Sequence, residues 1–308
     1  MKRLPYLRAT LKRPGGALGA VVLVLVLVVA YLGRLVAPHD PTATLGVAGA
    51  PAGSGTILGT DYLGRDVFSR VLNGGASAIT MAAIATIAAY LIGLTIGIIA
   101  GYFGHAIDMI LMRSVDIILA FPPLMVLLLL VGGFSNHIWV LVLGVVLVQL
   151  PSIARVARAA AQALRFTEFV DAARARGDGL VTIWRRDILA NIYSVVLADF
   201  GIRFGISIIL IASMNFLGLG LTPPASDWGL MISENKDLLN TNPWAVLAPA
   251  IMLALITVAL NLFADAYVAC VNGGSASVQA VAGAVDEETT GNAIASPVPV
   301  VELGRVSK

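Results

Sequence analysis

Charged residues and cysteines are both scarce in this 308-residue chain. Asp, Glu, Lys and Arg together make up 12% of it, about half of the ~25% that is usual in soluble globular proteins. The single cysteine, Cys270, has no partner for an internal disulfide, and the three histidines lack the spacing of metal ligands. The composition therefore argues against a disulfide-stapled domain and against metal or redox chemistry.

Motifs for nucleotide hydrolysis and nucleophilic catalysis are also missing. The chain contains no G-x-x-x-x-G-K-[ST] phosphate loop, no nucleophile elbow and no His-Glu metal motif. We therefore expect a protein that is not an enzyme and binds no cofactor of its own. If nucleotide drives its activity, another polypeptide must bind the ATP.

Long apolar runs dominate what is present. The mean hydropathy is +0.90, and a helix needs about 20 mostly apolar residues to cross a bilayer. Six runs approach that length, at residues 17–36, 76–100, 109–132, 138–154, 188–218 and 244–264. They predict an all-α integral membrane protein with six transmembrane helices.

Positive residues lie mainly before the first run and between the fourth and fifth runs. Lys and Arg concentrate in cytoplasmic segments, so both regions and both chain termini are expected in the cytoplasm. Residues 1–16 then form a cytoplasmic segment and residues 17–268 a transmembrane domain. Residues 269–308 lack a helical apolar period and are expected to form an unfolded cytoplasmic tail. Three tryptophans fall near the outer interface: Trp139, Trp228 and Trp244.

A short polar helix is predicted within the cytoplasmic stretch at about residues 155–190. Thr167 is placed to cap it, and Glu168 and Asp171 lie in its first turn, where the helix dipole favours acids. Gly177 and Gly179 end it. The spacing is compatible with a helix that docks into a partner or with an ordinary solvated connection.

The run "DAARARG", followed by "DILAN", resembles the "EAA" signature of permease subunits of ABC importers. In that family the stretch is the coupling helix that sits in a cleft of the ATPase subunit. Ala190 stands where the family usually has proline. The resemblance assigns the ATPase contact to Asp171, Ala172, Ala173 and Gly177, and we expect Glu168 and Arg174 to flank it.

Three further stretches are similar to permeases of the dipeptide, oligopeptide and nickel type. They are "LGTDYLGRDVFSRVLNGG", "DMILMRSVDIILAFPPLMVLLLLV" and "FLGLGLTPPASDWGLMISE". The second membrane subunit of the dipeptide permease is the nearest in pattern. The resemblance implies a type I ABC importer permease fold in the cytoplasmic (inner) membrane.

The same resemblance implies a set of partners. They are a homologous second permease subunit, two ATP-binding subunits or domains, an extracytoplasmic solute-binding protein, membrane lipid and a peptide substrate, with no nucleic acid. Nickel chelates, glutathione or another small solute are alternative cargoes. A gradient-driven carrier that uses Asp116 and Asp199 as a proton relay, and a scaffold without transport, are rivals from other classes.

Residues 58–75 have the pattern of an amphipathic helix on the outer membrane surface. Val67, Val71 and Leu72, with Phe68, form its apolar face, and Asp66 is one turn from Arg70.

Charged residues also fall inside or at the ends of the apolar runs, where an unpaired charge costs at least ~2.5 kcal/mol. Arg113 with Asp116, and Asp199 with Arg203, are spaced to pair along one helix face. The second pair either lines a water-filled passage for a zwitterionic peptide or locks helices together. Asn215 and Asn261 are further candidates for the passage lining.

Three glycines, Gly93, Gly97 and Gly101, repeat every four residues down the second run and predict close helix packing.

Overall fold

The computed structural model describes residues 4–53, 55–134 and 137–294, and the regular secondary structure of that part is helical apart from two isolated β-bridges. The helices are α1 (Leu4–Lys12), α2 (Pro14–Val36), α3 (Val67–Asn73), α4 (Gly75–Phe103), α5 (His105–Leu119), α6 (Pro123–Gly133), α7 (Ile138–Leu164), α8 (Glu168–Ala175), α9 (Leu180–Thr182), the π-helix η1 (Ile183–Ile188), α10 (Leu189–Phe216), α11 (Trp228–Asn235), the 3₁₀-helix η2 (Lys236–Leu238) and α12 (Trp244–Ile294). The predicted all-α class is confirmed.

Five segments are long and apolar enough to cross a membrane, and a bent pair of helices supplies a sixth. The five are residues 14–36, 67–103, 138–164, 195–216 and 244–270, and the pair is α5 with α6, bent by 83°. The prediction of six spans is confirmed when this pair counts as one span. The bend lies at Pro122 and Pro123, because proline disfavours helical backbone before it and has no N–H to donate.

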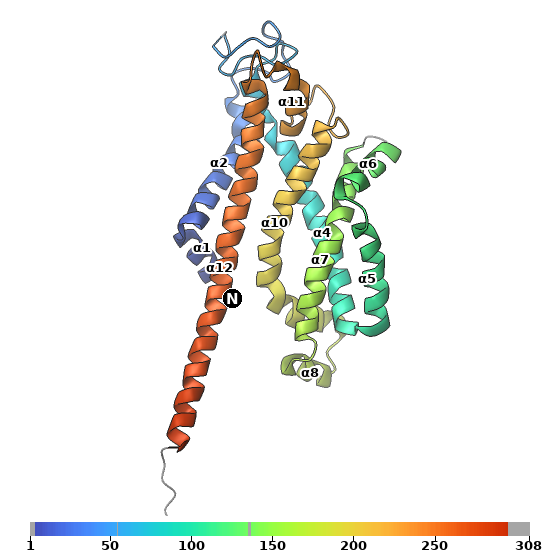
Figure 1. Cartoon of the computed structure of the whole chain (residues 1–308), viewed down its shortest axis with the longest axis vertical. Helices are drawn as coiled ribbons and strands as arrows, with labels where there is room; N and C mark the ends of the chain where they lie inside the picture. Colours follow the sequence, from blue (N-terminus) through green and yellow to red (C-terminus); the bar gives the residue numbers. More distant parts are fainter. Residues whose placement is uncertain (1–3, 54, 135–136, 295–308) are drawn as a thin grey trace, which may run out of the picture.

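The helices form an elongated bundle with two distinct ends (Figure 1). α2 runs beside α12, α4 packs along α7, and α10 contacts both α4 and α12. The N-terminal end of the described chain lies in the half of the molecule that holds α8 (Figure 1). α1 packs on α12, and the Arg13 guanidinium donates to the Ala269 carbonyl over 3.4 Å.

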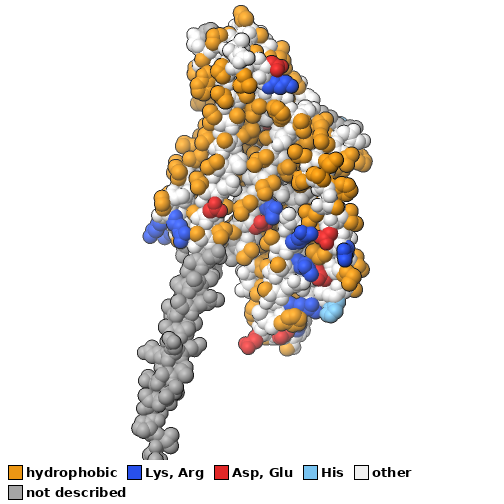
Figure 2. Space-filling model, in the orientation of Figure 1, with side chains coloured by type: hydrophobic (Ala, Val, Ile, Leu, Met, Phe, Trp, Pro, Cys, Tyr) orange, Lys and Arg blue, Asp and Glu red, His pale blue; other side chains and the backbone are white. Residues whose placement is uncertain are grey.

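The outward faces of the helices are apolar. On α2, Leu18, Val21 and Leu25 each expose more than half of their surface. Figure 2 shows apolar side chains over most of the visible bundle. Most of the Lys and Arg side chains in this view lie in the lower half, toward α8. Such a surface suits contact with lipid.

The glycine row on α4 faces α7. A Cβ on Gly97 would lie 2.6 Å from the Cβ of Ala157, and one on Gly101 would lie 2.8 Å from the Cβ of Ala161. Gly93 faces Ile153 at a similar distance. The predicted close packing is confirmed, and it joins two helices of the same chain.

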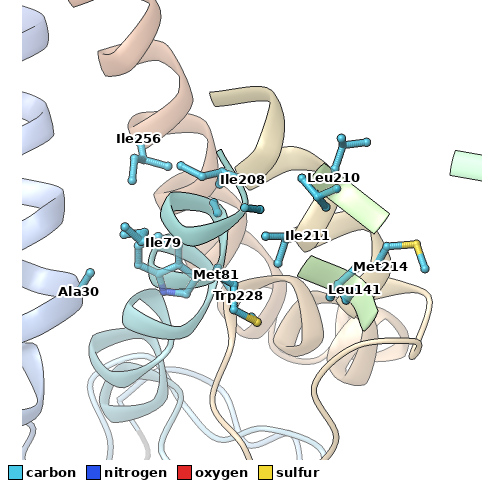
Figure 3. Packing of buried hydrophobic residues seen from close by; sticks show 14 of the residues in the cluster. Ala30, Ile79, Met81, Leu141, Ile208, Leu210, Ile211, Met214, Trp228 and Ile256 are labelled. Carbon is cyan, nitrogen blue, oxygen red and sulfur yellow. The ribbon is translucent and has the colours of Figure 1, made fainter. Parts of the chain in front are cut away.

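Residues 37–66 and 217–243 form a cap at the end of the bundle opposite α8 (Figure 1). Trp228 of α11 anchors this cap from within: its side chain is fully buried, and its indole N–H donates to the Val71 carbonyl over 2.9 Å. Figure 3 shows it among buried side chains of α4 and α10, including Ile79 and Ile211. The prediction of an interfacial Trp228 is therefore wrong, whereas Trp139 and Trp244 are exposed.

α3 also differs from its prediction. Val67, Val71 and Leu72 are buried as expected, but so are Ser69 and Arg70, so the helix packs inside the cap and has no solvated polar face. Asp66 does not pair with Arg70. Its carboxylate caps α3 by accepting from the Phe68 and Ser69 N–H groups, because an acid at the N-cap satisfies otherwise unpaired donors.

The C-terminal tail is helical further than expected. α12 continues through Ile294, so the prediction of an unfolded segment from residue 269 is wrong up to that point. Alanine and valine recur through residues 276–285, and no proline interrupts the chain between Pro249 and Pro297. The rest of the predicted tail, residues 295–308, lies outside the described residues.

Candidate functional sites at the α8 end and between the helices

α8 forms at the predicted position and presents two different faces. Glu168 and Asp171 lie in its first turn, where their charge complements the helix dipole. Thr167 occupies the N-cap, but its side chain does not cap the helix as predicted. Its hydroxyl donates backward to the Leu164 carbonyl over 2.7 Å.

The end of α8 is set by Gly177. This residue has φ = +78°, the left-handed backbone that glycine adopts without strain. The Gly177 N–H donates to the Arg174 carbonyl and the Asp178 N–H to the Ala173 carbonyl, at 2.9 and 3.1 Å. This pair of bonds is a Schellman motif. The predicted termination of the helix by glycine is confirmed.

The inward face of α8 packs against the bundle. Val170 and Ala173 are fully buried and share a hydrophobic cluster with Ile98 of α4 and with Ile183 and Ile188 of η1. The outward face is open, with Glu168, Phe169, Asp171, Ala172 and Arg174 all exposed. The two signature alanines thus have opposite roles, because Ala173 is packed and Ala172 is presented.

Arg174 ties α8 to the end of α4. Its Nη1 lies 3.0 Å from Asp171 Oδ1, its Nε donates to the Tyr102 hydroxyl over 3.0 Å, and its guanidinium stacks 4.8 Å from the Tyr102 ring centre. α8 is therefore positioned by packing and by this contact together.

A polar network joins α4, α7 and α10 inside the bundle. Tyr90 donates to Asp199 over 2.6 Å, and Arg203 lies 3.3 Å from the same carboxylate, which confirms the predicted Asp199–Arg203 pair. Gln149 continues the network by donating to the Arg203 carbonyl and to Ser207. The side chains of Asp199 and Arg203 are 16% and 19% exposed. The pair is therefore partly accessible from outside the protein.

The other two passage candidates have different surroundings. Asn215 is fully buried. Its amide nitrogen donates to Asp227 Oδ1 and its amide oxygen accepts from the Leu221 N–H, each over 2.9 Å. Its polar atoms are therefore used within the fold. Asn261 is exposed on α12.

Asp227 is a buried carboxylate that sequence reasoning missed. It caps α11 and also accepts from Ser77 of α4 and from Asn215 of α10. Burial raises the pKa of Asp227, and the hydrogen bonds oppose that rise.

The charges on α5 pair with α7. Asp108 makes a two-point contact with Arg158 at 2.5 Å, and Asp116 pairs with Arg155 at 2.6 Å. The predicted Arg113–Asp116 pair is therefore wrong, because Asp116 meets the neighbouring helix instead of its own helix.

Sequence reasoning also missed a buried cluster of four charges in the cap. Asp61 accepts from Arg65 and Arg70 at 2.6 and 2.5 Å, and Glu234 of α11 lies 2.8 Å from Arg70 and 3.3 Å from Arg65. All four side chains are at most 6% exposed. The available signal was the density of charge at residues 61–70 of a chain with so few charged residues.

A pocket of about 570 Å³ opens between α6, α10, α11 and α12 near the cap. Its walls are mostly apolar, with hydroxyls from Ser213 and Thr257, and α11 contributes Gly229 and Ile232. This volume falls within the ~300–1,000 Å³ of small-molecule pockets.

Comparison with known proteins gives a family match. Residues 93–272, which include α8, match the family described as "binding-protein-dependent transport system inner membrane component". A solved structure of the MetNI methionine ABC transporter in inward-facing conformations covers 62% of this chain and 93% of its own, with 19% identity and a TM-score of 0.47.

Curated relatives agree with that match over most of the chain. The dipeptide transport system permease protein DppC of Alkalihalophilus pseudofirmus is 33% identical over 208 residues, 68% of each protein. The glutathione transport system permease protein GsiD of Pectobacterium atrosepticum is 34% identical over 68% of this chain and 69% of its own. DppC of Haemophilus influenzae is 28% identical over 82% and 88%. This chain belongs to the family of inner membrane components of binding-protein-dependent transport systems.

Proposed function

We propose that this chain is a peptide-translocating permease subunit of an ATP-driven importer, and that separate ATPase subunits bind it at α8. The observation that carries the proposal is the two-faced geometry of α8, with Val170 and Ala173 packed inward and Ala172 presented outward. Peptide as cargo is supported by the relatives named for dipeptide transport.

In the proposed orientation the α8 end and both chain termini lie in the cytoplasm, and the cap lies outside. The placement of Lys and Arg supports this, since the visible face gathers most of them toward α8 (Figure 2). Arg155 and Arg158 lie on α7, which precedes α8 in the chain, and Arg185 and Arg186 lie on η1, which follows α9.

Force from the ATPases would enter through the outward face of α8, which carries Glu168, Asp171, Ala172 and Arg174. The inward face would pass it on, because Val170 and Ala173 pack in one cluster with residues of α4, α7 and η1. η1 continues directly into α10. Tilting of α8 would therefore shift the helices that carry the Asp199 network.

The proposed passage includes Asp199 and Arg203, with Asn261 as a further candidate. A carboxylate beside a guanidinium suits a ligand with free amino and carboxylate groups, and Tyr90 holds Asp199 in place. The pocket at Ser213 and Thr257 would receive the peptide nearer the cap.

The proposed assembly contains a homologous second permease subunit, two ATP-binding subunits or domains, and an extracytoplasmic solute-binding protein. ATP would be bound by those partners, and this chain would need no cofactor of its own. The binding protein would meet the cap, the part of the molecule farthest from α8 (Figure 1).

Substitution at Gly177 tests the coupling role. Gly177→Val forces a β-branched residue into φ = +78° at a site where a Cβ meets no neighbour within 4 Å, so strain at the end of α8 is the main effect. We expect normal membrane insertion, retained ATP hydrolysis by the assembled transporter and loss of peptide uptake. Gly179→Val is the matched control, since Gly179 is also uncrowded but lacks a positive φ. Uptake at the wild-type rate in Gly177→Val would count against the proposal.

Uptake by reconstituted vesicles identifies the cargo and the energy source. Labelled dipeptide, glutathione and nickel chelate are offered separately, with and without ATP. Uptake of dipeptide that requires ATP supports the proposal. Preferential uptake of the nickel chelate would show that the cargo is a nickel complex and not a peptide. Uptake that survives loss of ATP but collapses with an uncoupler would indicate a gradient-driven carrier.

A further inference from the structure

A narrow apolar groove runs along α4 at the α8 end of the bundle. It measures about 150 Å³ and is lined by Thr95, Ile98, Ile99, Tyr102, Phe103, Val181, Trp184 and Ile188. The Thr95 hydroxyl donates to the Leu91 carbonyl of its own helix, which satisfies the one polar group at the deep end. From Thr95 to Phe103 the groove follows about 12 Å of helix, from inside the apolar span to the last residue of α4.

One hydrogen-bond donor in this groove has no acceptor. The Trp184 Nε1 atom is buried, and no partner for it exists in the part of the chain that the structure describes. Buried donors are nearly always paired in folded proteins. The indole N–H is therefore an unpaired donor in this structure, and Asp187 Oδ2, three residues further along η1, is buried and without a hydrogen-bond partner as well.

The surface around this end of the groove is rich in arginine. Arg185 and Arg186 directly follow Trp184 and are both exposed, and over the described residues no carboxylate forms an ion pair with either. Arg174 stacks on Tyr102, a wall residue. The acid nearest to Arg174, Asp171, is already paired with it. The mouth of the groove is therefore suited to an anion.

We propose that the groove binds an anionic phospholipid of the cytoplasmic leaflet. One acyl chain lies along Ile98, Ile99 and Phe103, and a phosphate or ester oxygen accepts from Trp184 Nε1. Arg185 and Arg186 neutralise the phosphate. An apolar slot, an unsatisfied donor and a cationic mouth match the three parts of that one ligand.

The bound lipid would support α8 from behind. Ile98 and Ile188 line the groove and belong to the same cluster as Val170 and Ala173 of α8. The inference rests on the proposed function only in placing the α8 end at the cytoplasmic leaflet, and it does not depend on the cargo or on the ATPase contact.

Tryptophan fluorescence in lipid nanodiscs tests the proposal on the full chain with the subunits that purify with it. Lipids with brominated acyl chains quench a tryptophan that they touch. We expect brominated phosphatidylglycerol to quench Trp184 at lower mole fraction than brominated phosphatidylcholine does. Trp184→Phe assigns the signal, because it should abolish the difference in quenching between the two lipids. Trp139→Phe, in the first turn of α7, is the control and should keep that difference.

Two further variants separate charge from shape. Arg185→Gln with Arg186→Gln should reduce the preference for phosphatidylglycerol by about fivefold for each arginine, the effect of one basic side chain near an anionic surface. Ile99→Phe fills the slot and should lower quenching by both lipids. Equal quenching by the two lipids, a preference that survives loss of both arginines, or no quenching of Trp184 because another subunit covers the groove would each overturn the proposal.

Discussion

Arg70 of α3 and Glu234 of α11 meet inside the cap, where Arg70 Nη1 donates to Glu234 Oε2 over 2.8 Å. Asp61 accepts from the same Nη1, and Arg65 reaches both carboxylates, so two positive and two negative side chains balance one another away from solvent. Through this cluster the residues before α4 hold the C-terminal end of α11. Asp227 holds its other end.

Removing one partner of this cluster is expected to destabilise the cap strongly. Glu234→Gln keeps the shape of the side chain but leaves the arginines without one counter-charge, and breaking a buried ion pair in this way typically costs about 3–5 kcal/mol. Thermal unfolding of the purified protein in detergent measures the loss. Asp237→Asn changes an exposed acid three residues after Glu234 that forms none of the cluster's ion pairs, and it should leave the midpoint unchanged. Equal midpoints for wild type and Glu234→Gln would disprove the structural role of the cluster.

Gly97→Ala should loosen the contact between α4 and α7. The added Cβ would lie 2.6 Å from the Cβ of Ala157 and 2.9 Å from the Arg158 nitrogen, so the helices must separate. Overpacking of this kind costs about 1–3 kcal/mol. Gly205→Ala in α10 is the matched control, because no atom lies within 4 Å of its Cβ position. We expect a lower unfolding midpoint only for Gly97→Ala, because alanine is otherwise the better helix former. A loss of the same size in both variants would mean that the close approach of α4 and α7 does not set the effect.

The two ion pairs between α5 and α7 should contribute unequally to stability. Asp108 binds Arg158 at two points and is 15% exposed, whereas Asp116 and Arg155 are 43% and 55% exposed. Asp108→Asn should cost about 1.5–3 kcal/mol, as for hydrogen bonds to charged groups. Asp116→Asn should cost at most about 1 kcal/mol. Unfolding midpoints of the two variants, compared in one detergent, test this order. A larger loss of stability for Asp116→Asn than for Asp108→Asn would contradict it.

Asp227 should give the cap a pH dependence of defined sign. Its folded-state pKa is raised, chiefly by burial, so the folded protein binds this proton more tightly than the unfolded chain does. The contribution to stability is therefore full below the unfolded pKa and is lost as the pH rises through the folded pKa. Asp227→Asn lacks this titration.

The unfolding midpoint of wild type minus that of Asp227→Asn should accordingly fall as the pH is raised from acidic to neutral. Taking the difference removes the titration of the other carboxylates. A difference that stays constant, or that grows with pH, would show that the four hydrogen bonds to Asp227 outweigh its burial.

The sequence predicted the features that depend on local pattern. Run length and hydropathy located the spans, because an isolated helix in lipid must satisfy its own backbone. The Gly177 stop also followed from local backbone preference, since glycine alone enters the left-handed region freely. The sharp bend at Pro122 and Pro123, inside the third predicted span, was not predicted.

Partners of charged residues could not be predicted in the same way. Spacing along one helix suggested Arg113 for Asp116 and Arg70 for Asp66, but the folded chain gives Asp116 an arginine from α7 and gives Arg70 two acids outside its own helix. Those contacts depend on which helices become neighbours. Trp228 was misplaced for the same reason, because the cavity that buries it is built by α4 and α10.

Site-directed crosslinking from α8 tests the central proposal most directly. Ala172→Cys, in a Cys270→Ser background, places a single thiol on the outward face of α8, and Val47→Cys places one on the exposed surface of the cap as the control. In the assembled, transporting complex we predict that a short thiol crosslinker joins the residue-172 variant, but not the residue-47 variant, to an ATPase subunit. A complex that imports peptide while the residue-172 thiol captures no ATPase would contradict the account.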